Sequence, residues 1–344
     1  MHWGRRSLRF VAIALGAALG VSGCHGGART GAQLTPPLVS PSHVEPSHAR
    51  LKEYLYATTL DWNAGNGTVY YYDAYGKNTS ALGSLTISSG FPDGVWTDRK
   101  GNVYVAVVNS VSNGRGYINV YTPAFGKLLR SYTAGLDGPS GGTFDAAGDM
   151  YVANLCGMAP SIQCFVFASP KDREFRRHVR LGGSTSGYVA IYPAGKMYPS
   201  SYLQSPINIA VGVGIDASNN VFVVNNTGGI AWNVIKFRAG QTQGKVVTFR
   251  DLPRQRWVGA DTFDPQNALV VSVNTAVDFF AREHGKPSRT LTDGIVAADG
   301  LAYGLDGTLF AGNYEFESNE GNIVAFPRDA DKPARTYAVP YGNG

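Results

Sequence analysis

The sequence lacks the features that mark several large classes of protein. Its apolar run near the N-terminus covers about a dozen residues, whereas a permanent membrane-spanning helix needs roughly 20. No segment repeats apolar residues with the 3.6-residue period of an amphipathic helix, which excludes an α/β enzyme fold. Phosphate-binding loops, dinucleotide fingerprints and zinc-spaced cysteine sets are also absent, which excludes the common nucleotide and structural zinc sites.

The N-terminus has the pattern of a secretory signal. Basic residues precede an uncharged run from Phe10 to Val21, and small residues follow it. The run ends in Val21-Ser22-Gly23-Cys24, which resembles the lipobox of bacterial lipoproteins, where the cysteine is acylated and becomes the new N-terminus. We therefore predict a signal peptide over residues 1–23 and lipid on Cys24. The alternatives are ordinary secretion and, less in keeping with the short run, a transmembrane anchor.

Residues 24–50 are rich in Gly, Pro, Ser and Thr and show no hydrophobic periodicity, so they predict a lipidated, flexible tether. Acyl chains hold a protein on a membrane because each buried methylene adds about 0.8 kcal/mol. We expect an exported monomer, anchored by its lipid to the bacterial cell envelope in the periplasm or at the cell surface. Loss of the leader lowers the formal net charge from +5 to +2, and we expect no nucleic-acid partner.

Two further cysteines, Cys156 and Cys164, would lie in a compartment where disulfides persist. We predict that they are paired, and the alternative is two free, buried thiols. They fall in an insertion of about residues 155–187 that also holds a basic run from Lys171 to Arg180.

An internal repeat defines the fold class. Six segments combine an aromatic or β-branched strand with a turn that ends in Gly-Lys or, in the last copy, Asp-Lys, and their lysines are Lys77, Lys127, Lys196, Lys245, Lys286 and Lys332. A second strand precedes each copy, and a third strand with an Asp- and Gly-containing turn precedes five of them. The sequence therefore predicts an all-β, six-bladed β-propeller of four-stranded blades over residues 51–344. The innermost strand of the first blade is not recognisable, so either an irregular N-terminal segment fills it or the blade is short.

Two of these repeats also resemble a known group of proteins. PDGVWTDRKGNVYVA (residues 92–106) and DGLAYGLDGTLFAG (residues 299–312) are similar to the repeats of NHL-type propellers and of the gluconolactonase and luciferin-regenerating family. In gluconolactonase-like members, acidic and amide side chains at the starts of the innermost strands hold a divalent cation that activates water on a lactone. The resemblance therefore implies a site near the propeller axis.

The residues at the corresponding positions supply only part of such a site. They are Asp93, Ser140, Val211, Gly259 and Asp299. We take Asp93, Ser140 and Asp299 as candidates for ligand or metal binding, with a divalent cation such as Ca²⁺ as the cofactor. Ca²⁺ requires six or more oxygen ligands, and Glu53 is the only further acidic candidate near the start of the propeller. The alternative is that both aspartates only cap turns.

Asparagines recur near the ends of the second strands, and we predict that they bind loop backbone. They are Asn109, Asn154, Asn225, Asn274 and Asn313.

Two functions are compatible with these residues. The first is a non-catalytic binding or scaffolding propeller that holds a protein, glycan or peptide on the face that bears the insertion. The alternative is a metal-dependent lactonase or hydrolase that uses Asp93 and Asp299. A serine hydrolase is excluded: the loop around Ser140 resembles a trypsin-like nucleophile loop, but it lies in repeat register, and neither His178 nor His284 has a matching context.

Overall fold

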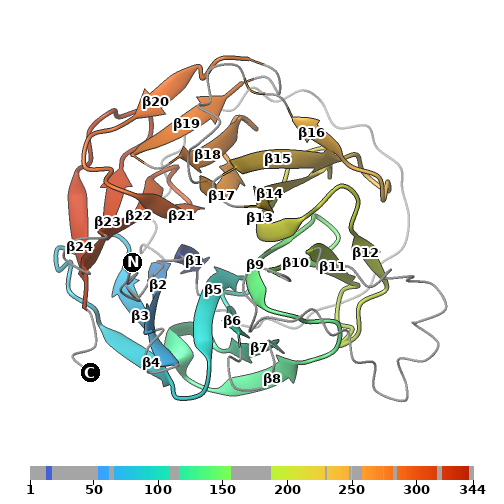
Figure 1. Cartoon of the computed structure of the whole chain (residues 1–344). Coiled ribbons are helices and arrows are strands. Elements are labelled where there is room, and N and C mark those ends of the chain that lie inside the picture. The colour runs from blue at the N-terminus through green and yellow to red at the C-terminus, as the bar shows by residue number, and fades with distance from the viewer. Residues whose placement is uncertain are drawn as a thin grey trace, which may run out of the picture.

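A computed structural model shows six four-stranded antiparallel sheets arranged around a central axis (Figure 1). The structure describes residues 13–17, 53–61, 66–108, 116–155, 187–228, 231–247, 249, 258–273, 275–281, 285–315 and 320–340. Each sheet consists of four strands that follow one another in the chain. The predicted all-β, six-bladed β-propeller is therefore confirmed.

The first three blades are formed by β1 (Ile13–Ala17), β2 (Glu53–Asp61), β3 (Asn66–Asp73) and β4 (Gly83–Ile87); by β5 (Phe91–Thr97), β6 (Val103–Val108), β7 (Gly116–Tyr121) and β8 (Leu128–Tyr132); and by β9 (Pro139–Phe144), β10 (Met150–Asn154), β11 (Tyr188–Tyr192) and β12 (Ser201–Leu203). The last three are formed by β13 (Ile209–Ile215), β14 (Val221–Gly228), β15 (Ala231–Phe237) and β16 (Lys245–Val247); by β17 (Val258–Phe263), β18 (Leu269–Val273), β19 (Ala276–Phe280) and β20 (Arg289–Leu291); and by β21 (Ala298–Tyr303), β22 (Leu309–Glu315), β23 (Glu320–Phe326) and β24 (Arg335–Val339). A short 3₁₀ helix, η1 (Pro123–Phe125), joins β7 to β8. None of the helices in the described ranges has the length and apolar character needed to cross a bilayer.

The turn between the first two strands of a blade is built by an aspartate, as the repeat predicts. In blade 2 the Asp98 carboxylate accepts hydrogen bonds of 2.9 Å from the backbone N–H groups of both Lys100 and Asn102. Gly101 has a φ of 76°, a conformation that glycine adopts without steric cost. In blade 4 the same place is taken by Asn219, with a φ of 59°. Asparagine tolerates this region better than other residues, so the turn keeps its shape.

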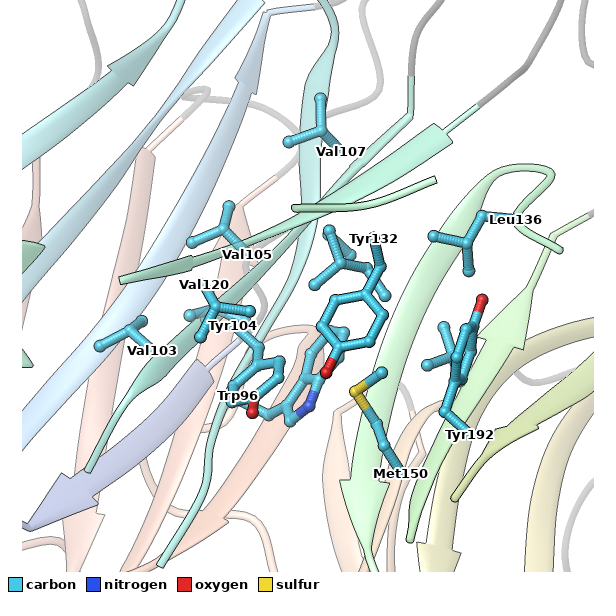
Figure 2. Packing of buried hydrophobic residues seen from close by; sticks show 14 of the residues in the cluster. Trp96, Val103, Tyr104, Val105, Val107, Val120, Tyr132, Leu136, Met150 and Tyr192 are labelled. Carbon is cyan, nitrogen blue, oxygen red and sulfur yellow. The ribbon is translucent and has the colours of Figure 1, made fainter. Parts of the chain in front are cut away.

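Apolar side chains fill the space between neighbouring blades. Figure 2 shows this packing around Trp96, Tyr104 and Tyr132 of blade 2 and Met150 and Tyr192 of blade 3. The rings of Trp96 and Tyr104 are stacked with their centroids 5.8 Å apart, and those of Tyr132 and Tyr192 meet edge to face at 5.4 Å. Because one blade cannot bury its own two faces, this contact between blades is what holds the ring together.

The last blade is joined to the first by side chains. The Tyr337 hydroxyl donates a 2.6 Å hydrogen bond to the carbonyl of Ala74, and the Tyr72 hydroxyl donates one of 3.0 Å to the carbonyl of Ala338. All four strands of blade 6 come from the C-terminal part of the chain, so no strand is exchanged between the two blades.

The innermost strand of the first blade comes from an unexpected part of the chain. Strand β1 pairs with β2 in the register Ile13↔Ala57 and lies beside β5 and β21. It thus completes the central ring of strands with residues that lie inside the predicted signal peptide. The predicted cleavage before Cys24 would remove β1. The bounds of the signal peptide, the tether and the propeller over residues 51–344 stay predictions.

Candidate functional site at the propeller axis

The candidate residues at the axis lie in β-bulges of the innermost strands. In blade 2, Pro92 pairs with Val107 and Gly94 pairs with Ala106, so Asp93 is the extra residue. The extra residues of blades 3, 4 and 6 are Ser140, Val211 and Asp299, and in blade 5 the register shift spans Gly259 and Ala260. A bulge changes the direction of a side chain and is common beside active sites. The strands therefore begin earlier than the sequence suggested, and these residues lie within them rather than before them.

Asp93 and Asp299 form an interacting pair, which we call the axial pair. Their strands, β5 and β21, lie on either side of β1 (Figure 1). Both side chains are half-buried. The protein around Asp93 desolvates its carboxylate, and together with the negative charge of Asp299 this raises the pKa of Asp93 to about 8. Near neutral pH the pair therefore holds a proton that ordinary surface aspartates would have lost.

Blade 5 contributes a glycine to the surroundings of Asp299. A Cβ atom on Gly259 would lie 2.5 Å from the Cα atom and 2.5 Å from the Oδ1 atom of Asp299. Any side chain at position 259 would therefore displace both the backbone and the carboxylate of Asp299. The absence of a side chain at position 259 of β17 is what allows Asp299 its present position.

Ser140, the third candidate, is used in a contact between blades. Its side chain is buried, and its Oγ atom donates a hydrogen bond of 2.8 Å to the carbonyl of Val211, with the carbonyl of Ala210 at 3.2 Å. The hydroxyl thus links β9 to β13.

The fit of the site to a divalent cation is incomplete. Within the described ranges, no group of three His, Cys, Asp or Glu side chains is placed to hold an ion. Glu53 accepts a hydrogen bond of 3.2 Å from the N–H of Leu305 and lies with Tyr75 and Asp306 at the turn between β21 and β22, which is the opposite end of β21 from Asp299. Two carboxylates are fewer than a hard cation needs, so Ca²⁺ stays a prediction.

The recurrent asparagines hold backbone, as the sequence predicts. The Asn154 side chain accepts a hydrogen bond of 2.9 Å from the N–H of Asp137, and Asn313 accepts one of 3.1 Å from Val296. Asn225 does the same for Asn208. Each asparagine thus fixes the segment that leads into the innermost strand of its blade. Asn109 and Asn274 lie outside the described residues.

Several other predictions also concern residues that the structure does not describe. They include the lipid on Cys24, the pairing of Cys156 with Cys164, and most of the insertion. These stay predictions.

Asp261 is a residue that sequence reasoning missed. It lies in β17, is buried, and neither of its carboxylate oxygens has a hydrogen-bond partner among the described residues. The signal was present in the repeat, because the matching position is apolar in the neighbouring blades 4 and 6, where Val213 and Leu301 stand.

Comparisons with known proteins show similarity in structure alone. No family model matches the chain, and no curated protein matches it. Among solved structures, a candidate gluconolactonase is similar with a TM-score of 0.53 at 13% identity, over 83% of this chain and 87% of that one. A gluconolactonase from Xanthomonas campestris, described as important in glucose secondary metabolic pathways, has a TM-score of 0.50 at 15% identity, over 74% and 78%. Hydrazine synthase from Kuenenia stuttgartiensis has a TM-score of 0.50 at 13% identity, over 80% and 74%. The fold is thus that of gluconolactonase-like six-bladed propellers.

Proposed function

We propose that the protein hydrolyses a lactone or a related ester at the axial pair. The observation that carries this proposal is that Asp93 and Asp299 interact at the axis, where burial and, to a smaller extent, the charge of Asp299 raise the pKa of Asp93 to about 8. Catalytic acids and bases work best when their pKa lies near the working pH. Two interacting carboxyl groups that share a proton offer both an acid and a base at one place.

The chemistry needs one proton to be taken and one to be given. The ionised carboxylate of the pair accepts a proton from water, whose oxygen forms the new bond to the carbonyl carbon of the lactone. The protonated carboxyl donates its proton to the ring oxygen as the acyl C–O bond breaks. The product is a hydroxy acid, and the pair has exchanged the roles of acid and base. No step of this sequence requires a cation.

Two of the similar structures support a lactone as the substrate class, since both are described as gluconolactonases. This favours the hydrolase alternative over the non-catalytic scaffold that the sequence put first. A divalent cation, if bound, would supply electrostatic stabilisation to the carbonyl oxygen. We also propose the exported, lipid-anchored location predicted from Cys24. The mature chain would then lack β1, but it keeps β5 and β21, which carry the axial pair.

Hydrolysis of glucono-δ-lactone tests the proposal. The rate of hydrolysis is measured from the release of protons and compared with the spontaneous rate. We expect the purified protein to accelerate hydrolysis and the Asp299→Asn variant to be slower by roughly 100-fold or more, because the variant loses one partner of the pair. Asp329→Asn is a matched control, since Asp329 lies in an exposed turn of blade 6 with a φ of 62°, which asparagine also tolerates.

Each reaction is run with added Ca²⁺ or Mn²⁺ and with a chelator, to separate a cation requirement from the role of the carboxylates. Equal rates for Asp299→Asn and Asp329→Asn would contradict the proposal. So would a parent protein that is inactive on both lactones and simple esters.

A further inference from the structure

Asp261 is an acidic side chain in an apolar contact between blades 4 and 5. It is 8% exposed, and both carboxylate oxygens lack a hydrogen-bond partner in the part of the chain that the structure describes. A buried polar group without a partner is costly to the fold and calls for an explanation.

The register of the repeat shows how unusual this position is. Asp261 pairs with Val271 in the second strand of its blade. Three other blades have a pair in the same register: Val95 with Val105, Val213 with Val223, and Leu301 with Ala311. All three of these counterparts are buried hydrophobic residues. A carboxyl group therefore stands where three other blades bury hydrocarbon.

The neighbouring blade leaves room for this carboxyl group. A Cβ atom on Gly212 would lie 3.2 Å from its Oδ1 atom, and one on Gly214 would lie 3.1 Å from its Oδ2 atom. The carboxyl group thus lies directly against the backbone of β13. Neither oxygen has a hydrogen-bond partner among the described residues. The neutral acid therefore packs there at a lower cost than the anion.

No positive charge faces Asp261 from the strands packed against β17. Strands β13, β14 and β18 contain no titratable residue. Strand β21 carries Asp299 and Tyr303, but it belongs to the next blade and meets β17 on the other side, at Gly259. Burial raises the pKa of Asp261 to about 8, with a smaller opposing effect from the N–H groups of Asp261 and Gly214, neither of which makes a regular hydrogen bond to it.

We propose that Asp261 makes the contact between β13 of blade 4 and β17 of blade 5, which we call the joint, sensitive to ionisation. The joint is closed while the carboxyl group is neutral and opens when this group becomes an anion. The protonated acid fills its place against Gly212 and Gly214. The anion must gain water, and separation of β13 from β17 would admit it.

Opening of this joint would reach the axial pair through β17. The same strand carries Gly259, against which Asp299 lies. A shift of β17 would therefore change the position of Asp299, so that alkaline pH would switch off the site. This consequence rests on the proposed function, whereas the joint itself does not.

Amide hydrogen exchange tests the joint without any substrate. Protection of β13 and β17, corrected for the intrinsic pH dependence of exchange, is measured at about pH 6.5 and about pH 9, on either side of the raised pKa. A group whose folded pKa is raised stabilises the closed state at low pH and loses that effect as pH rises through the folded value. We expect protection in the two strands to fall by roughly 10-fold or more between these pH values, while β8 at the outer edge of blade 2 changes little.

Variants of Asp261 separate this group from the other buried acid. Asp261→Asn, which mimics the neutral acid in shape, and Asp261→Val, which restores the residue type of blades 2 and 4, should both keep their protection at alkaline pH. Asp93→Asn should still show the fall in β13 and β17. The proposal is overturned if the parent protein is equally protected at both pH values, or if Asp261→Asn loses protection as the parent does.

Discussion

Replacing Asp93 with asparagine should lower lactone hydrolysis by roughly 10²- to 10⁴-fold, the range expected when a general acid or base is removed. Asparagine has the shape of the protonated carboxyl group but can neither accept a proton from water nor deliver one to the leaving oxygen. The loss should appear mainly in kcat, since proton transfer belongs to the transition state. The measurement is steady-state hydrolysis of the best lactone at several pH values.

The pH profile gives this prediction a second readout. In the parent protein kcat/KM should change around pH 8, because burial and Asp299 raise the pKa of Asp93 to about that value. The two proteins are compared in the Asp261→Asn background, so that ionisation of Asp261 adds no change of its own near the same pH. In that background the Asp93→Asn variant should lack this change. It should also be at least as stable as the parent in alkali: a raised folded pKa means that the parent loses stability as pH rises through about 8, and asparagine cannot ionise. A variant with the parent's rate and pH profile would show that Asp93 takes no part.

Replacing Gly94 with alanine should destabilise the propeller by about 3 kcal/mol or more, the upper part of the range for overpacked sites. A Cβ atom at this position would overlap the carbonyl oxygen of Ser140 in the next blade and lie 2.7 Å from its carbonyl carbon. These are backbone atoms of β9, so they cannot turn away as a flexible side chain can. The free energy of unfolding, measured by chemical denaturation, checks the result.

Gly141→Ala is the matched control for this substitution. Gly141 follows the bulge of blade 3 as Gly94 follows that of blade 2, but its Cβ atom would meet nothing closer than the carbonyl oxygen of Val211, at 3.5 Å. This is ordinary contact, so we expect a change of less than about 1 kcal/mol, the size of the usual difference between glycine and alanine. Equal effects of the two substitutions would mean that the close approach of β5 and β9 does not limit the packing of the ring.

The repeat made most of the fold predictable. Turn residues such as Asp98 and Gly101 recur because each blade needs the same hairpin, so one sequence displays the rule several times. The same regularity drew attention to Asp93 and Asp299, which interrupt it at the axis. Their proximity could also be predicted, because Asp93 belongs to blade 2 and Asp299 to blade 6, and in a closed ring both of these blades adjoin blade 1.

Other features could not be predicted because they depend on contacts between blades. Strand β1 has no Asp-containing turn, and its pairing with β2 gives no sequence signal. Ser140 was a candidate by its position, but only the structure shows its hydroxyl on the carbonyl of Val211. Asp261 lies in perfect register with apolar residues, yet its lack of a hydrogen-bond partner is a property of the packing against Gly212 and Gly214.

Titration of the Asp93 carboxyl group by NMR tests the central claim most directly. The side-chain carboxyl carbons of aspartate are labelled with ¹³C, and the signal of Asp93 is assigned through its loss in Asp93→Asn. In the parent protein Asp93 should titrate with a pKa of about 8. In Asp299→Asn its pKa should be lower, because one of the two causes of the shift is removed while burial stays. A pKa of Asp93 near the ordinary value of about 3.9, or one that does not respond to the loss of Asp299, would contradict the account of an axial pair that shares a proton.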